Sequence, residues 1–431
     1  MTKSLAAALA LAAICVGPLW ADTAEVEDMK SSIAGLKAHL ADQERRLAEL
    51  ETAQQRDAEY AKVIEELRAD AAGRPGGPAW LENLKFSGDL RLRYQGECFS
   101  GNNDKNRNRA RVRLRFGFVK KWMDDQMEVG FRLASGESTA RNGQHILSDA
   151  TSTNQTLTDN FSEKSIWIDR AYAKYTPNGA FKGLTIIGGK FGVPLVSTNL
   201  IWDGDVNLEG AYVEYKRAFG CVEPFAGVGY FIAQESGGGH DVILTAYQGG
   251  ARVKFTEDVK WTSAATFYDY DHYDEGYLNA YGNRVAVDGD LAAGQFHVIN
   301  FTNFVDFKVF DLPWTAYLDY AHNCGNSDQL DAWDDQDDAY AVGLKVGKNK
   351  KKGDWSAGYK YAYIEANSVP GGFNDGDFGH SNRKGHVWNA AYNLTDYLTL
   401  GGAVLWLEPV IGDAIENQRD TVVQADLIWK F

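Results

Sequence analysis

Basic and apolar residues alternate at every second position through residues 107–118. The run contains four arginines, each followed by an apolar residue: Arg109, Ala110, Arg111, Val112, Arg113, Leu114, Arg115 and Phe116. A β-strand points successive side chains to opposite faces and so separates the two kinds of residue, whereas a helix with 3.6 residues per turn mixes them. Residues 84–94 repeat the pattern, with Arg91 and Arg93 set among apolar neighbours. Both segments are predicted to be strands with one charged and one apolar face.

The period of two continues to the C-terminus and predicts sixteen strands. They are expected at 84–95, 108–120, 126–134, 165–175, 183–191, 209–217, 223–232, 242–255, 259–270, 294–306, 313–321, 339–347, 354–364, 385–394, 397–407 and 420–431. Short turns and long loops alternate between them, and each strand is near the roughly 9–11 residues that cross a membrane layer at a tilt. The pattern does not assign the faces of 165–175 and 223–232. The sequence thus predicts an all-β fold, a transmembrane antiparallel β-barrel of about 16 strands over residues 84–431.

The charged face could point outward from a soluble β-sandwich or inward to a water-filled lumen. On a lipid face each arginine would cost about 2–4 kcal/mol at the membrane midplane. The alternation of loop lengths, and a last strand that ends on Phe431, favour the membrane barrel. Its apolar face then meets lipid, and five arginines are predicted to line the lumen: Arg91, Arg93, Arg111, Arg113 and Arg115.

The first 21 residues have the pattern of a signal peptide. Lys3 precedes an apolar stretch over residues 5–16, which Gly17 and Pro18 end. That stretch is too short to span a bilayer. Ile14 stands before Cys15 where a lipoprotein signal needs a small residue, so a lipid anchor is not expected.

Residues 22–72 follow a heptad rather than a period of two. Ten of the fourteen a and d positions are apolar, among them Leu36, Leu40 and Leu47. A lone helix with one narrow apolar stripe lacks a surface to bury it against, so a periplasmic coiled coil is predicted. The alternative is a single helix that packs on its own barrel. A Gly/Pro linker at 73–83 would join this helix to the barrel.

Charge and cysteine usage narrow the function classes. The net charge of −15 argues against nucleic-acid binding, which needs a basic face. No cysteine or histidine stands in a metal-binding or catalytic motif, so no cofactor, metal or catalytic residue is predicted. The predicted topology leaves a Cys98–Cys324 disulfide open and expects Cys221 to be free. The acidic loop 322–338 is interpreted as solvated, with calcium binding or bridging to lipopolysaccharide as alternatives.

Several segments resemble the putative porin family of Gram-negative outer membranes. They are residues 86–94, the arginine-rich strand from 107, residues 168–172, 188–191 with Pro194, and 201–205 ahead of 209–210. The resemblance implies passive diffusion of small hydrophilic solutes through a homotrimer in the outer membrane, in contact with the lipid bilayer and lipopolysaccharide. It further implies that the third long loop, 192–208, narrows the lumen with Asp203, Asp205 and Glu209.

Alternatives remain for the chain and for its arginines. The barrel could anchor a tether that reaches the cell wall through residues 22–72, or it could be a substrate-selective porin for anions such as phosphate. A surface enzyme is a third class. The arginines could simply be neutralised by wall carboxylates such as Asp89, Glu128 and Asp169, without a part in permeation.

Overall fold

The computed structural model describes residues 30–31, 34–48, 62, 82–99, 106–141, 144–147, 149–158, 160–273, 280–283, 295–325, 336–411 and 419–431. The chain divides into two units, Met1–Glu82 and Asn83–Phe431. The predicted signal peptide and most of the predicted linker lie outside the described residues. Within the described residues, no helix combines the length and the apolar character needed to cross a membrane.

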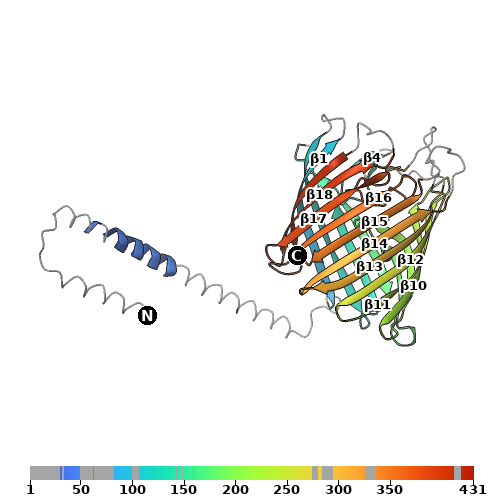
Figure 1. The fold of residues 1–431 in the computed structure, drawn as a ribbon, viewed down its shortest axis with the longest axis horizontal. Helices are drawn as coiled ribbons and strands as arrows, with labels where there is room; N and C mark the ends of the chain where they lie inside the picture. The colour runs from blue at the N-terminus through green and yellow to red at the C-terminus, as the bar shows by residue number, and fades with distance from the viewer. Residues whose placement is uncertain are drawn as a thin grey trace. The chain divides into compact units, whose positions relative to one another are not determined.

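The N-terminal unit is helical at residues 30–31, 34–48 and 62 (Figure 1), and Glu82 at its end lies in a turn. In the stretch 34–48 the heptad leucines Leu36, Leu40 and Leu47 are 71 %, 59 % and 59 % exposed. Asp42 pairs with Arg45 at 2.6 Å and with Arg46 at 3.1 Å on the helix surface. The predicted helix is confirmed over this stretch, and its apolar stripe is uncovered in the single chain.

The second unit is a closed antiparallel barrel whose wall consists of sixteen strands. Its wall strands are β1 (Leu84–Phe99), β2 (Arg107–Trp122), β3 (Met127–Ser135), β7 (Ile166–Tyr175), β8 (Leu184–Gly192), β9 (Asn207–Lys216), β10 (Val222–Gln234), β11 (Val242–Lys254), β12 (Val259–Asp271), β13 (His297–Val309), β14 (Leu312–Asn323), β15 (Asp338–Gly347), β16 (Trp355–Ile364), β17 (Arg383–Asn393), β18 (Leu398–Pro409) and β19 (Arg419–Lys430). Each wall strand pairs with its sequence neighbour, and β19 pairs with β1 to close the ring. All sixteen predicted strands are confirmed.

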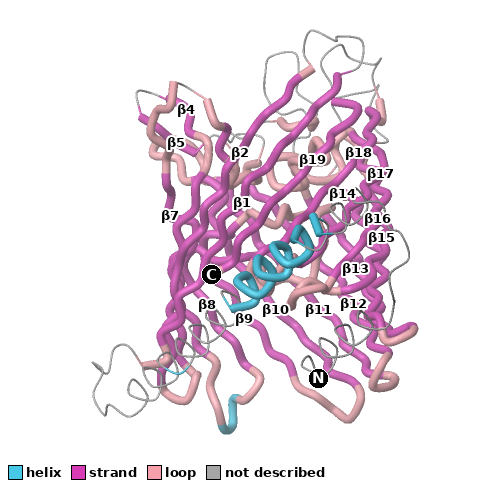
Figure 2. Tube along the Cα trace, turned by 90° about the vertical axis from the view of Figure 1, so that its left-hand side faces the viewer, coloured by secondary structure: helices cyan, strands magenta, loops and turns pink. Residues whose placement is uncertain are grey.

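Short turns gather at one end of the barrel and long loops at the other, as Figures 1 and 2 show. We call these the short-turn end and the long-loop end. The C-terminal Phe431 lies at the short-turn end, where it exchanges two backbone hydrogen bonds with Gly88 at 2.8 and 3.1 Å. Between β3 and β7 the chain adds β4 (Ser138–Arg141), β5 (Gln144–Leu147) and the two-residue strand β6 (Gln155–Thr156). β6 pairs with β2.

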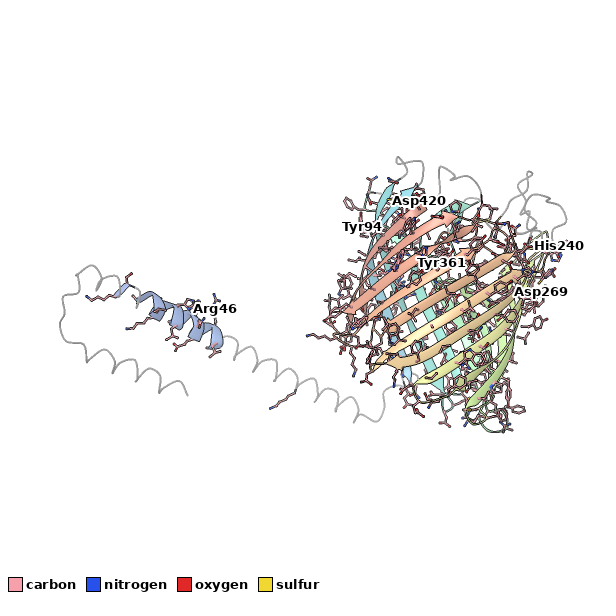
Figure 3. All side chains as sticks on the ribbon, viewed as in Figure 1. Arg46, Tyr94, His240, Asp269, Tyr361 and Asp420 are labelled. Atoms are coloured by element: carbon pink, nitrogen blue, oxygen red, sulfur yellow. The ribbon has the colours of Figure 1, made fainter. Side chains whose placement is uncertain are left out.

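The two faces of β1 and β2 separate as predicted. Arg91, Arg93, Arg111 and Arg113 are only 7–9 % exposed, and Arg115 is partly buried. The apolar residues between them are exposed on the outside of the wall, where Tyr94 is visible in Figure 3. The arginines therefore point into the barrel, and the orientation expected from the polarity argument is confirmed.

Part of the interior is a packed apolar core rather than an open lumen. The loops 193–206 and 365–382 fold inward and pack against the inner face of β9 to β13. Their buried residues include Leu200, Ile201, Trp202, Val369 and Phe378. The expectation of a wet lumen is thus wrong for this side, because two loops supply apolar side chains that match an apolar stretch of inner wall. For the arginine side it stays a prediction.

An interruption of the pairing between β3 and β7 explains why the alternation of polar and apolar residues does not assign the faces of 165–175. The register between β3 and β7 shifts after Arg132, which leaves Asp169 as an extra residue. Asp169 and Arg170 are then both directed inward, where Asp169 binds Arg132 and Asn207. A β-bulge of this kind resets the faces on either side of it.

The three described cysteines, Cys98, Cys221 and Cys324, are free and exposed. A disulfide between Cys98 and Cys324 is therefore not part of this structure. Cys221 is free, as predicted.

Candidate functional site

The arginine ladder, defined as Arg91, Arg93, Arg111, Arg113 and Arg115, divides by the partners of its members. Arg113 and Arg115 share the carboxylate of Asp89, at 2.7 and 2.8 Å. Arg93 binds Asp426 of β19 through two nitrogens, at 2.7 and 2.9 Å, and Asp377 at 3.0 Å. These three guanidinium groups have carboxylate partners at hydrogen-bond distance.

Arg91 and Arg111 bind neutral groups at that distance. Arg91 donates to Asn154 Oδ1 at 2.6 Å, and Arg111 donates to Gln95 at 3.2 Å and to Ser152 at 3.3 Å. Their closest carboxylates are 3.9 Å away, on Asp426 and Glu137. The Nε atoms of both arginines are buried and have no hydrogen-bond partner among the described residues. Part of the positive charge of the ladder is therefore not locally neutralised.

Loop 193–206 carries two aspartates across the barrel toward the ladder. Asp205 accepts hydrogen bonds from Thr153, from the amide at 3.0 Å and the hydroxyl at 2.8 Å, and lies 3.4 Å from Arg115. Asp203 accepts the amide of Asp205 at 2.9 Å and the amide of Gly376 at 3.2 Å. The predicted inward fold of this loop is thus present in the structure.

Two wall strands hold the loop in place. Gln248 of β11 binds both the amide and the carbonyl of Val196, at 2.9 and 3.0 Å. Thr198 donates its hydroxyl hydrogen to Asp319 of β14 at 2.5 Å. Since both wall residues are buried, these hydrogen bonds fix the loop well inside the barrel.

A second loop, 365–382, completes the site. Its backbone joins loop 193–206 at three points: Asp203 N to Phe373 O at 2.8 Å, Asp375 N to Asn199 O at 3.2 Å, and Gly376 N to the Asp203 carboxylate. It brings Asp375 and Asp377 next to Asp203. The sequence analysis did not predict this contribution, although three apolar residues in a supposedly exposed loop, Val369, Phe373 and Phe378, were a readable signal.

A cavity of about 320 Å³ is lined by charges of both signs. Its basic lining residues are Arg91, Arg109, Arg111 and Arg113, and its acidic lining residues are Glu137, Asp149, Asp203, Asp205, Asp375 and Asp377. Two more cavities, of about 460 and 400 Å³, adjoin it, and Asn199 lines all three. Asn199 of loop 193–206 therefore lies where these three cavities adjoin one another.

Two acids of the site titrate in opposite directions. Burial raises the pKa of Asp203 well above its ordinary value, and the neighbouring Asp375 and Asp205 raise it further. Burial also acts to raise the pKa of Asp377, but the charge of Arg93 and its hydrogen bond at 3.0 Å outweigh burial and lower the pKa to about 2. Asp203 is thus the acid of this pair that takes up a proton first as the pH falls.

Comparisons with known proteins agree with this architecture. The model of the putative porin family matches residues 47–106, 100–288 and 286–431. The chain belongs to the putative porin family. It is accordingly a porin of the outer membrane, and the proteins of this family and fold are channels rather than enzymes.

The solved structure of Pseudomonas putida OprB has the same fold as this porin. OprB of Pseudomonas putida is 14 % identical, with a TM-score of 0.51, and the match covers 81 % of this chain and 94 % of OprB. Salmonella typhi OmpF, in a complex with daunomycin, is 10 % identical over 81 % of this chain and 97 % of that one, with a TM-score of 0.48. A mutant of Rh. blastica porin is 11 % identical over 81 % and 100 %, with a TM-score of 0.42. A search of curated proteins found no match.

One residue expected in the constriction of this porin lies elsewhere. Glu209 belongs to β9, and it shares the outward face of that strand with Val213 and Tyr215. Its carboxylate pairs with Lys190 of β8 at 2.5 Å, outside the barrel. The prediction for Glu209 is wrong because loop 193–206 ends before it, and the alternation of β9 turns it away from the lumen.

Of the three wall carboxylates expected to neutralise the ladder, only Asp89 pairs with it, and Asp426 of β19 is a further wall carboxylate that does so. Glu128 binds Lys174 at 2.8 Å and Tyr172 at 2.9 Å, and Asp169 binds Arg132. A third inward segment of the porin, residues 149–156, supplies neutral partners instead. The sequence analysis missed it, because polar residues between strands are typical of any exposed loop.

Proposed function

We propose that small hydrophilic solutes pass through this porin by way of the charged cavity between the arginine ladder and the aspartates of the two inward loops. The observation that carries this proposal is that arginines of the wall and Asp203, Asp205 and Asp375 of the loops line the same cavity. Opposite charges across a narrow aqueous passage create a transverse field, which orients dipolar solutes. A solute without polar groups would leave these charges unsolvated, so apolar solutes are excluded.

Arg91 and Arg111 are the residues that we expect to act most strongly on ions. Both lack a carboxylate at hydrogen-bond distance among the described residues, and their Nε atoms are buried without a hydrogen-bond partner there, so their charge is the least neutralised of the ladder. Arg113 and Arg115 share Asp89, which cancels part of their charge. These contacts support the arginine ladder as a pore lining. They also imply that its arginines differ in how strongly each affects ion selectivity.

Reversal potentials in a salt gradient across a planar bilayer test the proposal. Arg111→Ala should shift the selectivity toward cations, and Arg113→Ala should shift it less. Arg252→Ala is the matched control, because Arg252 pairs with Glu223 at 2.9 Å and does not line the charged cavity. An Arg111→Ala channel with the reversal potential of the wild type would contradict the proposal, and so would a silent bilayer.

The N-terminal unit supports a second, compatible role. We propose that residues 1–21 are removed on export, that residues 22–72 form a periplasmic coiled coil in a homotrimer, and that 73–83 link it to the barrel. The uncovered leucines Leu36, Leu40 and Leu47 support self-association, because burying each would gain roughly 1.5–3 kcal/mol. The coiled coil would also be the part that reaches the cell wall.

Deletion of residues 22–72 separates the channel from the tether. The truncated porin should keep stepwise conductance in bilayers and should lose co-sedimentation with isolated peptidoglycan. Leu40→Asp in the full chain should reduce the oligomer mass without a change in single-channel conductance. Loss of conductance in the truncated but folded barrel would contradict this division of roles.

A further inference from the structure

The barrel wall has a notch at the long-loop end, between β7 and β10. β8 pairs with β7 only from Ala171↔Lys190 onward, and β10 pairs with β9 only up to Phe231↔Gly210. Beyond these pairs, β7 continues to Ile166 and β10 to Gln234, whereas the β8–β9 hairpin turns inward as loop 193–206. The tip of that hairpin is therefore unpaired with both flanking strands in the described residues.

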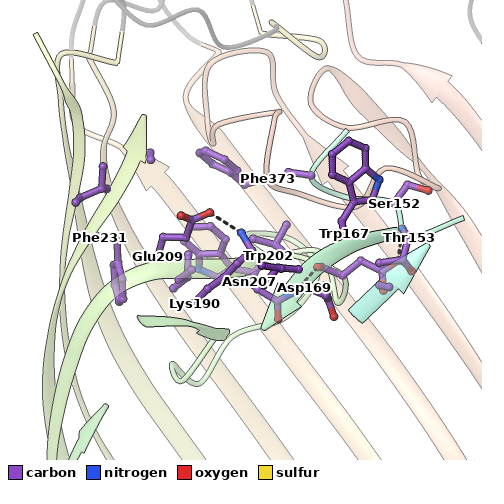
Figure 4. A pocket seen from close by; sticks show the side chains of 18 of the residues that line it. Ser152, Thr153, Trp167, Asp169, Lys190, Trp202, Asn207, Glu209, Phe231 and Phe373 are labelled. Atoms are coloured by element: carbon purple, nitrogen blue, oxygen red, sulfur yellow. Dashed lines mark hydrogen bonds and ion pairs between the residues drawn. The ribbon is translucent and has the colours of Figure 1, made fainter. Parts of the chain in front are cut away.

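A cavity of about 490 Å³ lies at the notch (Figure 4). Ile168, Ile232, Lys190 and Glu209 line it from the outward face of the wall, where Ile168 is 59 % and Ile232 is 45 % exposed. The packed core lines it from inside with Trp202, Leu208, Phe231, Leu244, Tyr270 and Phe373. The cavity thus draws its lining from both faces of the wall, and its size is within the roughly 300–1,000 Å³ of ligand sites.

The chemistry of the cavity changes from its mouth to its floor. The ion pair of Lys190 and Glu209 lies at the mouth, on the side of the barrel that faces lipid. Most of the floor consists of aromatic and aliphatic side chains: Trp202, Leu208, Phe231, Leu244 and Tyr270 are 1–7 % exposed, and Phe373 is half-buried. Ser152, Thr153, Asp169, Asp205 and Asn207 add polar groups to the lining. A polar mouth above an apolar floor fits a molecule with a polar head and a hydrocarbon chain.

We propose that the notch cavity binds one hydrocarbon chain of a membrane amphiphile, taken sideways from the lipid around the barrel. Lys190 and Glu209 contact the polar head, and the chain lies against Trp202, Phe231 and Phe373. The opening on the lipid-facing surface makes membrane amphiphiles the molecules that reach it without entering the lumen. A hydrocarbon chain that moves from lipid into the cavity gains little from apolar burial, so the mouth contacts and the shape of the cavity set the preference.

Because loop 193–206 contributes Trp202 and Val206 to this cavity, a bound chain also supports the loop from the side away from the ladder. The effect on the loop rests on the proposed permeation path, whereas binding of the hydrocarbon chain in the cavity does not. A test of binding alone therefore keeps the two proposals separate.

Photolabelling tests the binding. The full-length porin is reconstituted in nanodiscs of phosphatidylcholine that carries a diazirine at the chain end, with lipopolysaccharide present in one arm and absent in the other. After irradiation, peptide mass spectrometry should find Trp202, Phe231 or Phe373 labelled several-fold more than the outward residues Leu318 and Val342, which report on ordinary lipid contact. Suppression of the label by lipopolysaccharide would identify its acyl chain as the preferred source, and unchanged labelling would identify the phospholipid.

A variant that fills the notch cavity with a protein side chain tests the same proposal. Ala233→Trp places a large side chain in the notch and should abolish the label inside the cavity while the label on Leu318 persists. Ala265→Trp, on the outward face of β12, is the matched control and should leave the cavity label unchanged. Equal labelling of cavity and outer wall in the wild type would overturn the proposal without any variant. Intermolecular crosslinks between Ile168→Cys and Ile232→Cys chains, with no lipid label, would overturn it in favour of a second copy at the notch.

Discussion

Thr198 and Asp319 join two parts of the porin that are 121 residues apart in the chain, through a hydroxyl-to-carboxylate hydrogen bond of 2.5 Å. Thr198 lies in the loop that leaves β8, and Asp319 lies on β14, with β10 to β13 between them in the wall. Asp319 also accepts hydrogen bonds from Asn300 at 2.6 Å and from Thr302 at 2.9 Å, and it is fully buried. Loop 193–206 is therefore attached to the wall through a buried carboxylate that also accepts hydrogen bonds from its own wall neighbours.

Replacing Thr198 by valine removes one donor and keeps the shape of the side chain. A buried carboxylate that loses a donor is destabilised by about 1–3 kcal/mol, which should loosen the loop. We expect a higher and noisier single-channel conductance with a nearly unchanged barrel. Thr315→Val is the control, because Thr315 donates to Asp306 at 2.7 Å and does not contact the loop. Identical conductance traces for the two variants would show that the attachment does not set the pore size.

Asp203 predicts a pH dependence of ion selectivity. Its pKa is raised by burial and then by Asp375 and Asp205, so it takes up a proton at a higher pH than an ordinary aspartate. As the pH falls, the acidic side of the passage loses this charge first, and the selectivity should move toward anions well before the range of a free carboxylate. Because the raised pKa also means that the folded state binds this proton more tightly, the porin should gain stability from this group as the pH falls through that range.

Two variants separate this titration from others in bilayer recordings between pH 7 and pH 3. Asp203→Asn should remove the early step in the permeability ratio. Asp377→Asn should keep the step, because Arg93 holds the pKa of Asp377 down to about 2 and its charge persists through that range. A step of full size in Asp203→Asn would assign the titration to another group.

The wall of this porin was predictable from the sequence because its physics is local. Successive residues of a strand face lipid and lumen in turn. The faces of Arg111 and Leu114 therefore follow from the local alternation, without reference to the rest of the chain. The strand limits followed from the same alternation. The alternation does not predict the faces where strand pairing is irregular, as at Asp169. A β-bulge adds one residue there, and no local sequence pattern identifies that residue.

The constriction was only partly predictable, because it depends on contacts between distant loops. Asp203 and Asp205 were assigned through a family resemblance, and the structure brings them toward the ladder. Backbone hydrogen bonds to loop 193–206 bring Asp375 to the same place. Because any residue can form such bonds, the side chains of the sequence do not reveal them. Glu209 was assigned to the constriction only because it follows the loop closely in sequence. It is the third residue of β9, and at that position its side chain points outward from the wall.

Gly210 is predicted to be essential for the junction between β9 and its neighbours. Its φ is +151°, and a Cβ there would lie 2.1 Å from the carbonyl oxygen of Tyr230 and 2.9 Å from Phe231 Cα. Since backbone atoms of a paired strand cannot move aside cheaply, Gly210→Ala should cost more than the roughly 1–3 kcal/mol of a strained φ alone. Urea unfolding in liposomes, followed by tryptophan fluorescence, measures the loss. Gly249→Ala in β11, where a Cβ meets nothing within 4 Å, should be almost neutral.

The outward face of β2 offers a direct test that it contacts lipid. Leu114 is 39 % exposed, lies opposite Leu90 of β1 and stands near the middle of β2. Leu114→Arg should lower the free energy of unfolding in liposomes by about 2–4 kcal/mol, as expected for an arginine at the midplane. Ala110→Arg, on the same face but near the long-loop end, should cost only about 0–1 kcal/mol, since its charge reaches the interface. Equal costs at the two positions would mean that this surface is buried against protein rather than lipid, and the face assignment of the ladder would lose its energetic basis.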